Sequence, residues 1–266
     1  MLSSVELPTG VMDESYAAAR RSKPEHQFRL RTRAAVVAQA VLRFQGDGPV
    51  RLLEIGAADG RILLELAGTL PYRELVGVEY NAGLREAAPP LPHNVRLIAG
   101  DATALPLELG PGSFDVVSAL AVLEHLDEPT AALREAHRVL RPGGLLVATC
   151  PSPFWDALAG RAGLENPSHH VTAIDLRDLT NLFETTGFRV LAARGFMWVP
   201  VAVLPYLGLR VSPTSSLAID RIVSRIPLLR QLCVNAFVVG RRVSKLVVPN
   251  AASRRQADVV VGRSDS

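Results

Sequence analysis

The chain has 266 residues, of which 48% are apolar and 21% are charged, and its formal net charge is +3. A chain of this length and composition is expected to fold as one large domain, or as one domain with an added cap, which excludes a disordered protein. The small net charge also excludes a nucleic-acid-binding surface that extends over the whole chain.

The two cysteines, Cys150 and Cys233, are too few for a disulfide framework and suit a reducing compartment. No Cys/His cluster has the spacing of zinc ligands, so we expect no metal site. The N-terminus lacks a secretion signal, and the longest apolar stretch, 196–209, is interrupted by prolines and a glycine. We therefore expect a soluble, cytoplasmic protein that is at most peripheral to a membrane.

The first half of the chain predicts alternating strands and helices. Residues 14–44 favour helices divided at Pro24, and residues 45–49 form a break. The expected strands are Val50–Ile55, Leu75–Glu79, Val95–Ala99, Phe114–Ala119 and Leu145–Cys150, and the expected helices are Ile62–Leu70 and Thr130–Leu140, the latter stopped by Pro142–Gly144. Apolar strands without polar alternation indicate a parallel sheet buried on both faces, so the fold class is α/β.

After Pro151 we expect a helix over Asp175–Thr186 and strands over Phe188–Ala193 and Ala236–Arg242. The resulting organisation is a helical cap (1–45), an α/β core (46–195), a helical insertion with the final strand (196–243) and a flexible tail (244–266).

The segment Glu54–Gly60 follows the first strand directly and is rich in small residues. Small residues allow a tight turn and a close approach of a ligand to the backbone, next to the N-terminus of the following helix. A dinucleotide site would need glycines at positions 56, 58 and 61, but the chain has Ala58 and Arg61. The turn therefore suits a cofactor without a pyrophosphate, or a tight turn without a ligand.

Acidic residues follow the next two strands. Glu79 could accept two hydrogen bonds from a ribose diol, and Asp101 could accept one from an adenine amino group. Each acid alone also suits a solvated strand end or an ordinary turn. The small-residue turn, Glu79 and Asp101 fall at three consecutive strand ends, on the edge of the sheet where ligands bind. Together they indicate a nucleoside site.

With these residues, the chain resembles the class I S-adenosylmethionine (SAM) dependent methyltransferases, particularly the group of ubiquinone and small-molecule methyltransferases. The resemblance covers residues 51–187 and includes Phe114–Val117, Val122–Leu126 and Arg138–Gly144. It implies a Rossmann-like, seven-stranded, mostly parallel sheet with helices on both faces and an antiparallel last strand. The cofactor contacts that it implies are Glu54, Gly56, Ala57, Ala58, Gly60, Glu79, Tyr80, Asp101, Ala102 and Ala119. One departure is Ala58, where the family usually has Gly.

Catalytic candidates are histidines. His125 follows the fourth strand, where it could act as a general base or pack within the family's Glu-His pair. His169 and His170 precede the helix start at 172–175, and are either substrate contacts or ordinary loop residues.

Three arginines of the N-terminal cap, Arg29, Arg31 and Arg33, offer a partner for the SAM carboxylate, or form a solvated basic face. Asp59 beside the glycine turn could neighbour the methionine end of the cofactor.

The segment 201–248 is apolar and basic, with Asp220 as its only acid. At helical spacing it carries the apolar residues Leu217, Ile219, Ile222, Val223 and Ile226, with Asp220, Arg221, Ser224 and Arg225 on the other side. Three interpretations stay open: peripheral attachment to an anionic membrane, a lid over an apolar substrate pocket, or a helix packed on its own sheet.

The sequence thus predicts methyl transfer from SAM to an O, N or C atom of a small or lipid-like metabolite. Methylation of nucleic acid is disfavoured, because an Asn/Asp-Pro-Pro-aromatic segment is absent after the fourth strand, where Ser118–Ala121 stands instead. The alternative is a SAM-binding accessory or regulatory protein without turnover.

Overall fold

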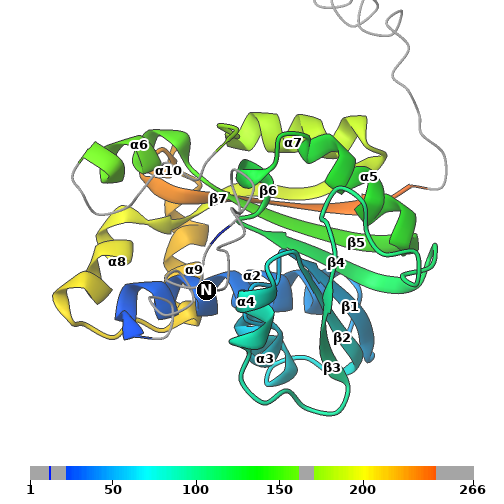
Figure 1. Cartoon of the computed structure of the whole chain (residues 1–266). Helices are drawn as coiled ribbons and strands as arrows, with labels where there is room; N and C mark the ends of the chain where they lie inside the picture. The colour runs from blue at the N-terminus through cyan, green and yellow to red at the C-terminus, as the bar shows by residue number, and fades with distance from the viewer. Residues whose placement is uncertain (1–11, 13–21, 162–170, 244–266) are drawn as a thin grey trace, which may run out of the picture.

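A computed structural model of the chain describes residues 12, 22–161 and 171–243 (Figure 1). Its centre is a seven-stranded sheet in the order β3-β2-β1-β4-β5-β7-β6. The strands are β1 (Val50–Ile55), β2 (Tyr72–Glu79), β3 (Val95–Ala99), β4 (Phe114–Leu120), β5 (Leu140–Pro151), β6 (Phe188–Trp198) and β7 (Cys233–Arg242). Strands β1 to β5 pair in parallel, and β7 runs antiparallel to both of its neighbours. The predicted α/β fold with an antiparallel last strand is confirmed.

Helices cover both faces of the sheet. They are α2 (Pro24–Phe44), α3 (Arg61–Ala67), α4 (Ala82–Glu86), α5 (Pro129–Val139), α6 (Pro153–Arg161), α7 (Leu176–Thr185), α8 (Val199–Val203), α9 (Pro213–Val223) and α10 (Pro227–Arg230), with 3-10 turns η1 (Leu123–His125) and η3 (Leu204–Leu207). Apolar residues of α2, α3, α8 and α9 pack on one face, and those of α5 and α7 pack on the other. The adjacent β1 residues Leu52 and Leu53 are both fully buried in these opposite clusters, which explains why the strand sequences lack polar alternation.

Strand β5 begins earlier than predicted. Leu140 of β5 already pairs with Phe114 of β4. The register then shifts before Leu145 pairs with Val116. Helix α5 therefore ends at Val139, and the glycine pair that we expected to stop the helix lies inside the strand.

Strands β6 and β7 are both longer than predicted. Their antiparallel pairing continues beyond the pair Ala193–Val238 as far as the pair Trp198–Cys233. Phe196 and Met197 are fully buried near the end of β6. The apolar segment after residue 193 is thus partly a strand of the sheet.

Helix α9 buries a carboxylate that the sequence placed on its solvent side. Asp220 is fully buried, so that prediction was wrong. Its oxygens accept hydrogen bonds from the backbone N–H groups of Met197 (2.9 Å) and Trp198 (3.0 Å) at the end of β6. These bonds compensate for the loss of water, which is the condition under which a buried acid is tolerated.

The apolar residues of α9 are divided between two faces as a consequence. Leu217 and Val223 are buried on either side of the carboxylate, whereas Ile219, Ile222 and the following Ile226 are exposed. The predicted single apolar stripe is therefore incorrect, because packing against β6 selects the face that holds the acid. No helix in the described part of the chain is long and apolar enough to cross a membrane.

Candidate functional site

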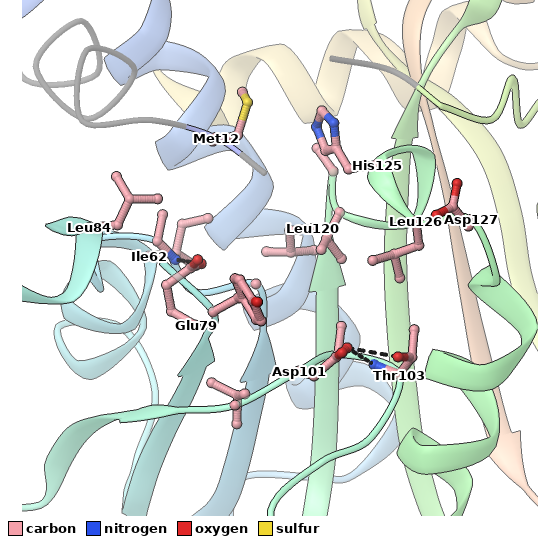
Figure 2. Close-up of a pocket in the computed structure, with 18 of the residues that line it drawn as sticks. Met12, Ile62, Glu79, Leu84, Asp101, Thr103, Leu120, His125, Leu126 and Asp127 are labelled. Carbon is pink, nitrogen blue, oxygen red and sulfur yellow. Dashed lines mark hydrogen bonds between the residues drawn. The ribbon is translucent and has the colours of Figure 1, made fainter. Parts of the chain in front are cut away.

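A cavity of about 470 Å³ lies at the carboxyl ends of β1 to β4 (Figure 2). Of the ten cofactor contacts that the resemblance implies and the catalytic candidate His125, seven line its wall: Gly56, Ala58, Glu79, Tyr80, Asp101, Ala102 and His125. The other four described residues, Glu54, Ala57, Gly60 and Ala119, are absent from the lining. His169 and His170 lie outside the described residues.

The turn after β1 depends on backbone conformations that favour glycine. Gly56 has φ +71°, and a Cβ there would lie 2.6 Å from Cγ2 of Val122, so no side chain fits. Gly60 has φ +72° and precedes α3. Ala58, between them, has φ +47° without being a glycine, so this turn carries local strain.

Glu79 connects the turns that follow β1 and β2. Its Oε2 accepts a hydrogen bond from the N–H of Ala58 and its Oε1 accepts one from the N–H of Asn81, both at 2.9 Å. A carboxylate oxygen has two acceptor positions, so each keeps one for a ligand. The arrangement suits a pair of adjacent hydroxyl groups.

Asp101 is exposed at the end of β3. Its Oδ1 accepts hydrogen bonds from the N–H and the Oγ1 of Thr103, both at 2.7 Å, which fix the orientation of the carboxylate (Figure 2). Its Oδ2 is left as an acceptor on the cavity wall. Tyr80, also on this wall, is 52% exposed.

The three arginines of α2 separate in the structure. Arg29 donates to Oη of Tyr206 (2.9 Å), and Arg31 pairs with Glu65 at the surface (3.3 Å). Only Arg33 lines the cavity, and its Nη2 donates to Oδ1 of Asn235 at 3.2 Å. Arg33 is therefore the one of the three that can meet an anionic ligand group in the cavity.

Asp59 does not reach the wall of the cavity. Its side chain is fully buried and its Oδ2 pairs with Nε of Arg61 at 3.0 Å. Asp59 is not among the residues that line the cavity. We therefore assign it to the support of the turn.

His125 lies in η1, on the side of the cavity that follows β4, together with Leu126 (Figure 2). Its neighbour Glu124 is almost fully buried, and the Glu124 carbonyl accepts hydrogen bonds from the N–H groups of Val171 and Thr172. These bonds tie η1 to the segment before α7.

Sequence reasoning missed much of the apolar lining. Met12 is held by Asn81, whose Nδ2 donates to the Met12 carbonyl at 2.7 Å, and it packs with Ala58 and Leu84. The other missed lining residues include Ile62, Leu120, Ala121, Val122 and Leu126. Val122 and Leu126 belong to the segment 122–126 that resembles the family, but the sequence did not assign them to the wall; Met12, Ile62 and Leu120 reach the cavity only through the packing of the elements. Among the described residues, no group of three or more His, Cys, Asp or Glu side chains is arranged to hold a metal ion.

Comparison with known proteins identifies relatives over the same region. Residues 28–193, more than half of the chain, match the family described as "Methyltransferase domain". A Mycolicibacterium smegmatis protein, named as a probable S-adenosylmethionine-dependent methyltransferase, is 32% identical over 146 residues, or 52% of each chain. The demethylmenaquinone methyltransferase of Renibacterium salmoninarum is 36% identical over 102 residues, or 35% of this chain and 42% of that protein. The chain thus spans about half the length of these curated relatives.

The fold is also similar to solved structures. A SAM dependent methyltransferase from Archaeoglobus fulgidus superimposes with a TM-score of 0.56 at 18% identity, over 86% of this chain and all of that one. At this identity the similarity concerns the fold alone.

Proposed function

The chain belongs to the family of methyltransferase domains, and from this premise we propose that it transfers a methyl group from SAM to an O, N or C atom of a small, hydrophobic metabolite. When bound, SAM supplies a methyl group already activated on a sulfonium, so the protein need not create an electrophile. The observation that carries the proposal is Glu79, whose two oxygens each accept one backbone N–H and keep an acceptor position toward the cavity.

The donor and acceptor groups of the cavity fit the cofactor. We assign the ribose hydroxyls to Glu79, the adenine amino group to Asp101 and the carboxylate of the methionine part to Arg33. The absence of a side chain at Gly56 lets Val122 pack against the turn, and both residues line the cavity beside the proposed cofactor position. Glu54, Ala57, Gly60 and Ala119 would act from behind this wall by supporting the turn and the strand end.

The acceptor would occupy the side of the cavity that follows β4. Val122 and Leu126 on that side favour a hydrophobic molecule, and His125 is the histidine of the cavity wall, beside the acids Asp127 and Glu128. We propose that His125 removes a proton from the acceptor when the acceptor atom carries one. Positioning of acceptor and donor in a closed site contributes about 7–11 kcal/mol to such reactions.

We further propose that the protein works in the cytoplasm at the periphery of a membrane, where hydrophobic metabolites accumulate. The basic part of the segment 201–248 supports this location. Residues 199–232 contain four arginines and a single acid, Asp220, and that acid is buried.

Calorimetry with SAM tests the cofactor assignment. Glu79→Ala should weaken SAM binding by at least tenfold, because two hydrogen bonds to a charged group are lost. The exposed acid Glu108 offers a matched control, and Glu108→Ala should bind SAM like the parent protein. Near-normal affinity of Glu79→Ala would refute the assignment.

The acceptor can be found with labelled SAM and a metabolite extract. A labelled, chloroform-soluble product would support transfer to a hydrophobic acceptor. A labelled product that stays in the aqueous phase would contradict that class. SAM binding without any labelled product would favour the accessory, non-catalytic alternative.

A further inference from the structure

One end of the molecule carries an unusual share of exposed apolar side chains. Of the thirteen large apolar residues that are exposed in the described chain, seven lie within residues 203–226. They are Val203, Tyr206, Leu207, Leu209, Ile219, Ile222 and Ile226. Figure 1 shows α8 and α9, which carry or flank these residues, at the left end of the molecule, with α6 and α10 above them. We call these seven residues, with Arg210 and Arg225, the insertion face.

Exposure on this scale requires an explanation. Leu207 is 69% exposed and Ile222 is 64% exposed, whereas single apolar residues elsewhere on a surface need none. Concentrated apolar exposure marks a surface that is covered by a partner or a membrane in use.

The exposed charged residues of the segment 199–232 all have one sign. Residues 199–232 contain four arginines, Arg210, Arg221, Arg225 and Arg230, and all four are exposed. The only acid in this range, Asp220, is fully buried. Among the described residues, no carboxylate forms an ion pair with these arginines. The surface therefore presents uncompensated positive charge beside apolar side chains.

The buried carboxylate fixes the orientation of this surface. Because Asp220 accepts hydrogen bonds from the Met197 and Trp198 N–H groups, α9 cannot rotate to bury Ile219 and Ile222 without breaking both bonds. The isoleucines are thus held outward by the fold.

The insertion face is also connected to the cavity. Tyr206 accepts a hydrogen bond from Arg29 of α2 at 2.9 Å, and Arg33, one helical turn further along α2, lines the cavity. Helix α2 therefore contacts both the insertion face and the wall of the cavity.

We propose that the insertion face docks the protein onto an anionic lipid bilayer. Leu207, Leu209 and Ile222 enter the boundary between headgroups and acyl chains, and Arg210 and Arg225 bind lipid phosphates. We commit to a bilayer because the exposed arginines complement anionic headgroups and the apolar side chains beside them complement the acyl chains. The inference rests on the proposed function only in that docking would bring a hydrophobic acceptor next to the cavity.

Flotation of the full-length protein with liposomes tests the proposal. The protein should float with vesicles of phosphatidylcholine that contain phosphatidylglycerol, and much less with phosphatidylcholine alone. Arg210→Gln combined with Arg225→Gln should weaken binding by about 25-fold, since each arginine near an anionic surface contributes about fivefold. Leu207→Ser combined with Ile222→Ser should weaken it by at least tenfold.

Two matched variants control for general loss of charge or apolar surface. Leu107 is 93% exposed in the loop after β3, and Arg134 is exposed on α5, both outside the insertion face. Leu107→Ser and Arg134→Gln should float like the parent protein. Equal loss of flotation in these controls, or no flotation of the parent with anionic vesicles, would overturn the proposal.

Sedimentation velocity and calorimetry separate the remaining outcomes. A dimer that dissociates on Leu207→Ser with Ile222→Ser, without any binding to vesicles, would assign the face to a second copy of the chain and overturn the proposal. SAM affinity should be the same in all face variants. A parent protein that floats but does not bind SAM would refute the proposed function and leave the docking inference standing.

Discussion

Arg33 on α2 and Asn235 on β7 are separated by 202 positions in the sequence, yet Nη2 of the arginine donates to Oδ1 of the asparagine at 3.2 Å. The Nδ2 of Asn235 lies 3.3 Å from Sδ of Met197, so both ends of the asparagine amide have a partner. The asparagine is almost fully buried, which leaves its side chain little freedom. The last strand of the sheet thus holds the arginine that faces the cavity.

Arg33→Ala should lower the affinity for SAM by about 10- to 100-fold, because a hydrogen bond to a charged group contributes about 1.5–3 kcal/mol. Calorimetry measures the change directly. Asn235→Ala should have a smaller effect of the same sign, since it removes a partner that positions the arginine. Arg31→Ala is the matched control on the same helix, because Arg31 pairs with Glu65 at the surface. An equal loss in Arg31→Ala would attribute the effect to α2 as a whole.

Ala58 offers a second prediction, because it occupies a left-handed conformation with φ +47°. A non-glycine residue there costs about 1–2 kcal/mol, and a glycine loses about 0.5–1 kcal/mol of chain entropy on folding. Ala58→Gly should therefore raise the free energy of unfolding by up to about 1 kcal/mol, measured by chemical denaturation. Ala57→Gly, at a neighbour without a positive φ, should lower it. A loss of stability in Ala58→Gly would show that the turn is not strained.

The succession of strands along the chain could be predicted from the sequence because each strand carries its own signal. Val50–Ile55 and Val95–Ala99 have the predicted bounds, since each of these strands is followed directly by a glycine. Strands β6 and β7 were predicted too short. Their ends depend on pairing partners such as Trp198 and Cys233, which are 35 residues apart and carry no local mark of strand structure.

The candidate site could be predicted in part for the same reason. Glu79 and Asp101 follow strands, so the parallel sheet brings them to one edge. The choice of Arg33 among three arginines required the packing of α2, and the burial of Asp220 required the path of β6. Spacing on one helix does not show which face its neighbours will cover.

Asp220 should make the stability depend on pH. Burial raises the pKa of its carboxyl group, and the hydrogen bonds from Trp198 and Met197 oppose this effect only in part. The folded protein then binds this proton more tightly than the unfolded chain does. The free energy of unfolding that Asp220 contributes therefore falls as the pH rises from the ordinary carboxyl pKa through the raised one, and is constant above it.

Asp220→Asn isolates this contribution, because the amide cannot ionise. As the pH rises across this range, the parent should lose free energy of unfolding relative to Asp220→Asn. The relative loss should be at most about 1.4 kcal/mol per pH unit. Denaturation at several pH values measures it. Asp47→Asn, on an exposed loop, is the matched substitution of a surface acid. A flat difference for Asp220→Asn would mean that this carboxyl group is not perturbed.

His125 decides whether the protein uses a general base. If it removes a proton from the acceptor, His125→Ala should lower kcat by about 10²–10⁴ and leave the dissociation constant for SAM unchanged. The acidic limb of the pH–rate profile should disappear with it, a change that loss of packing alone would not produce. His93→Ala, at an exposed position before β3, is the control and should keep full turnover. Full turnover in His125→Ala would mean that this histidine only lines the cavity. Positioning of the acceptor and the methyl donor would then account for the transfer.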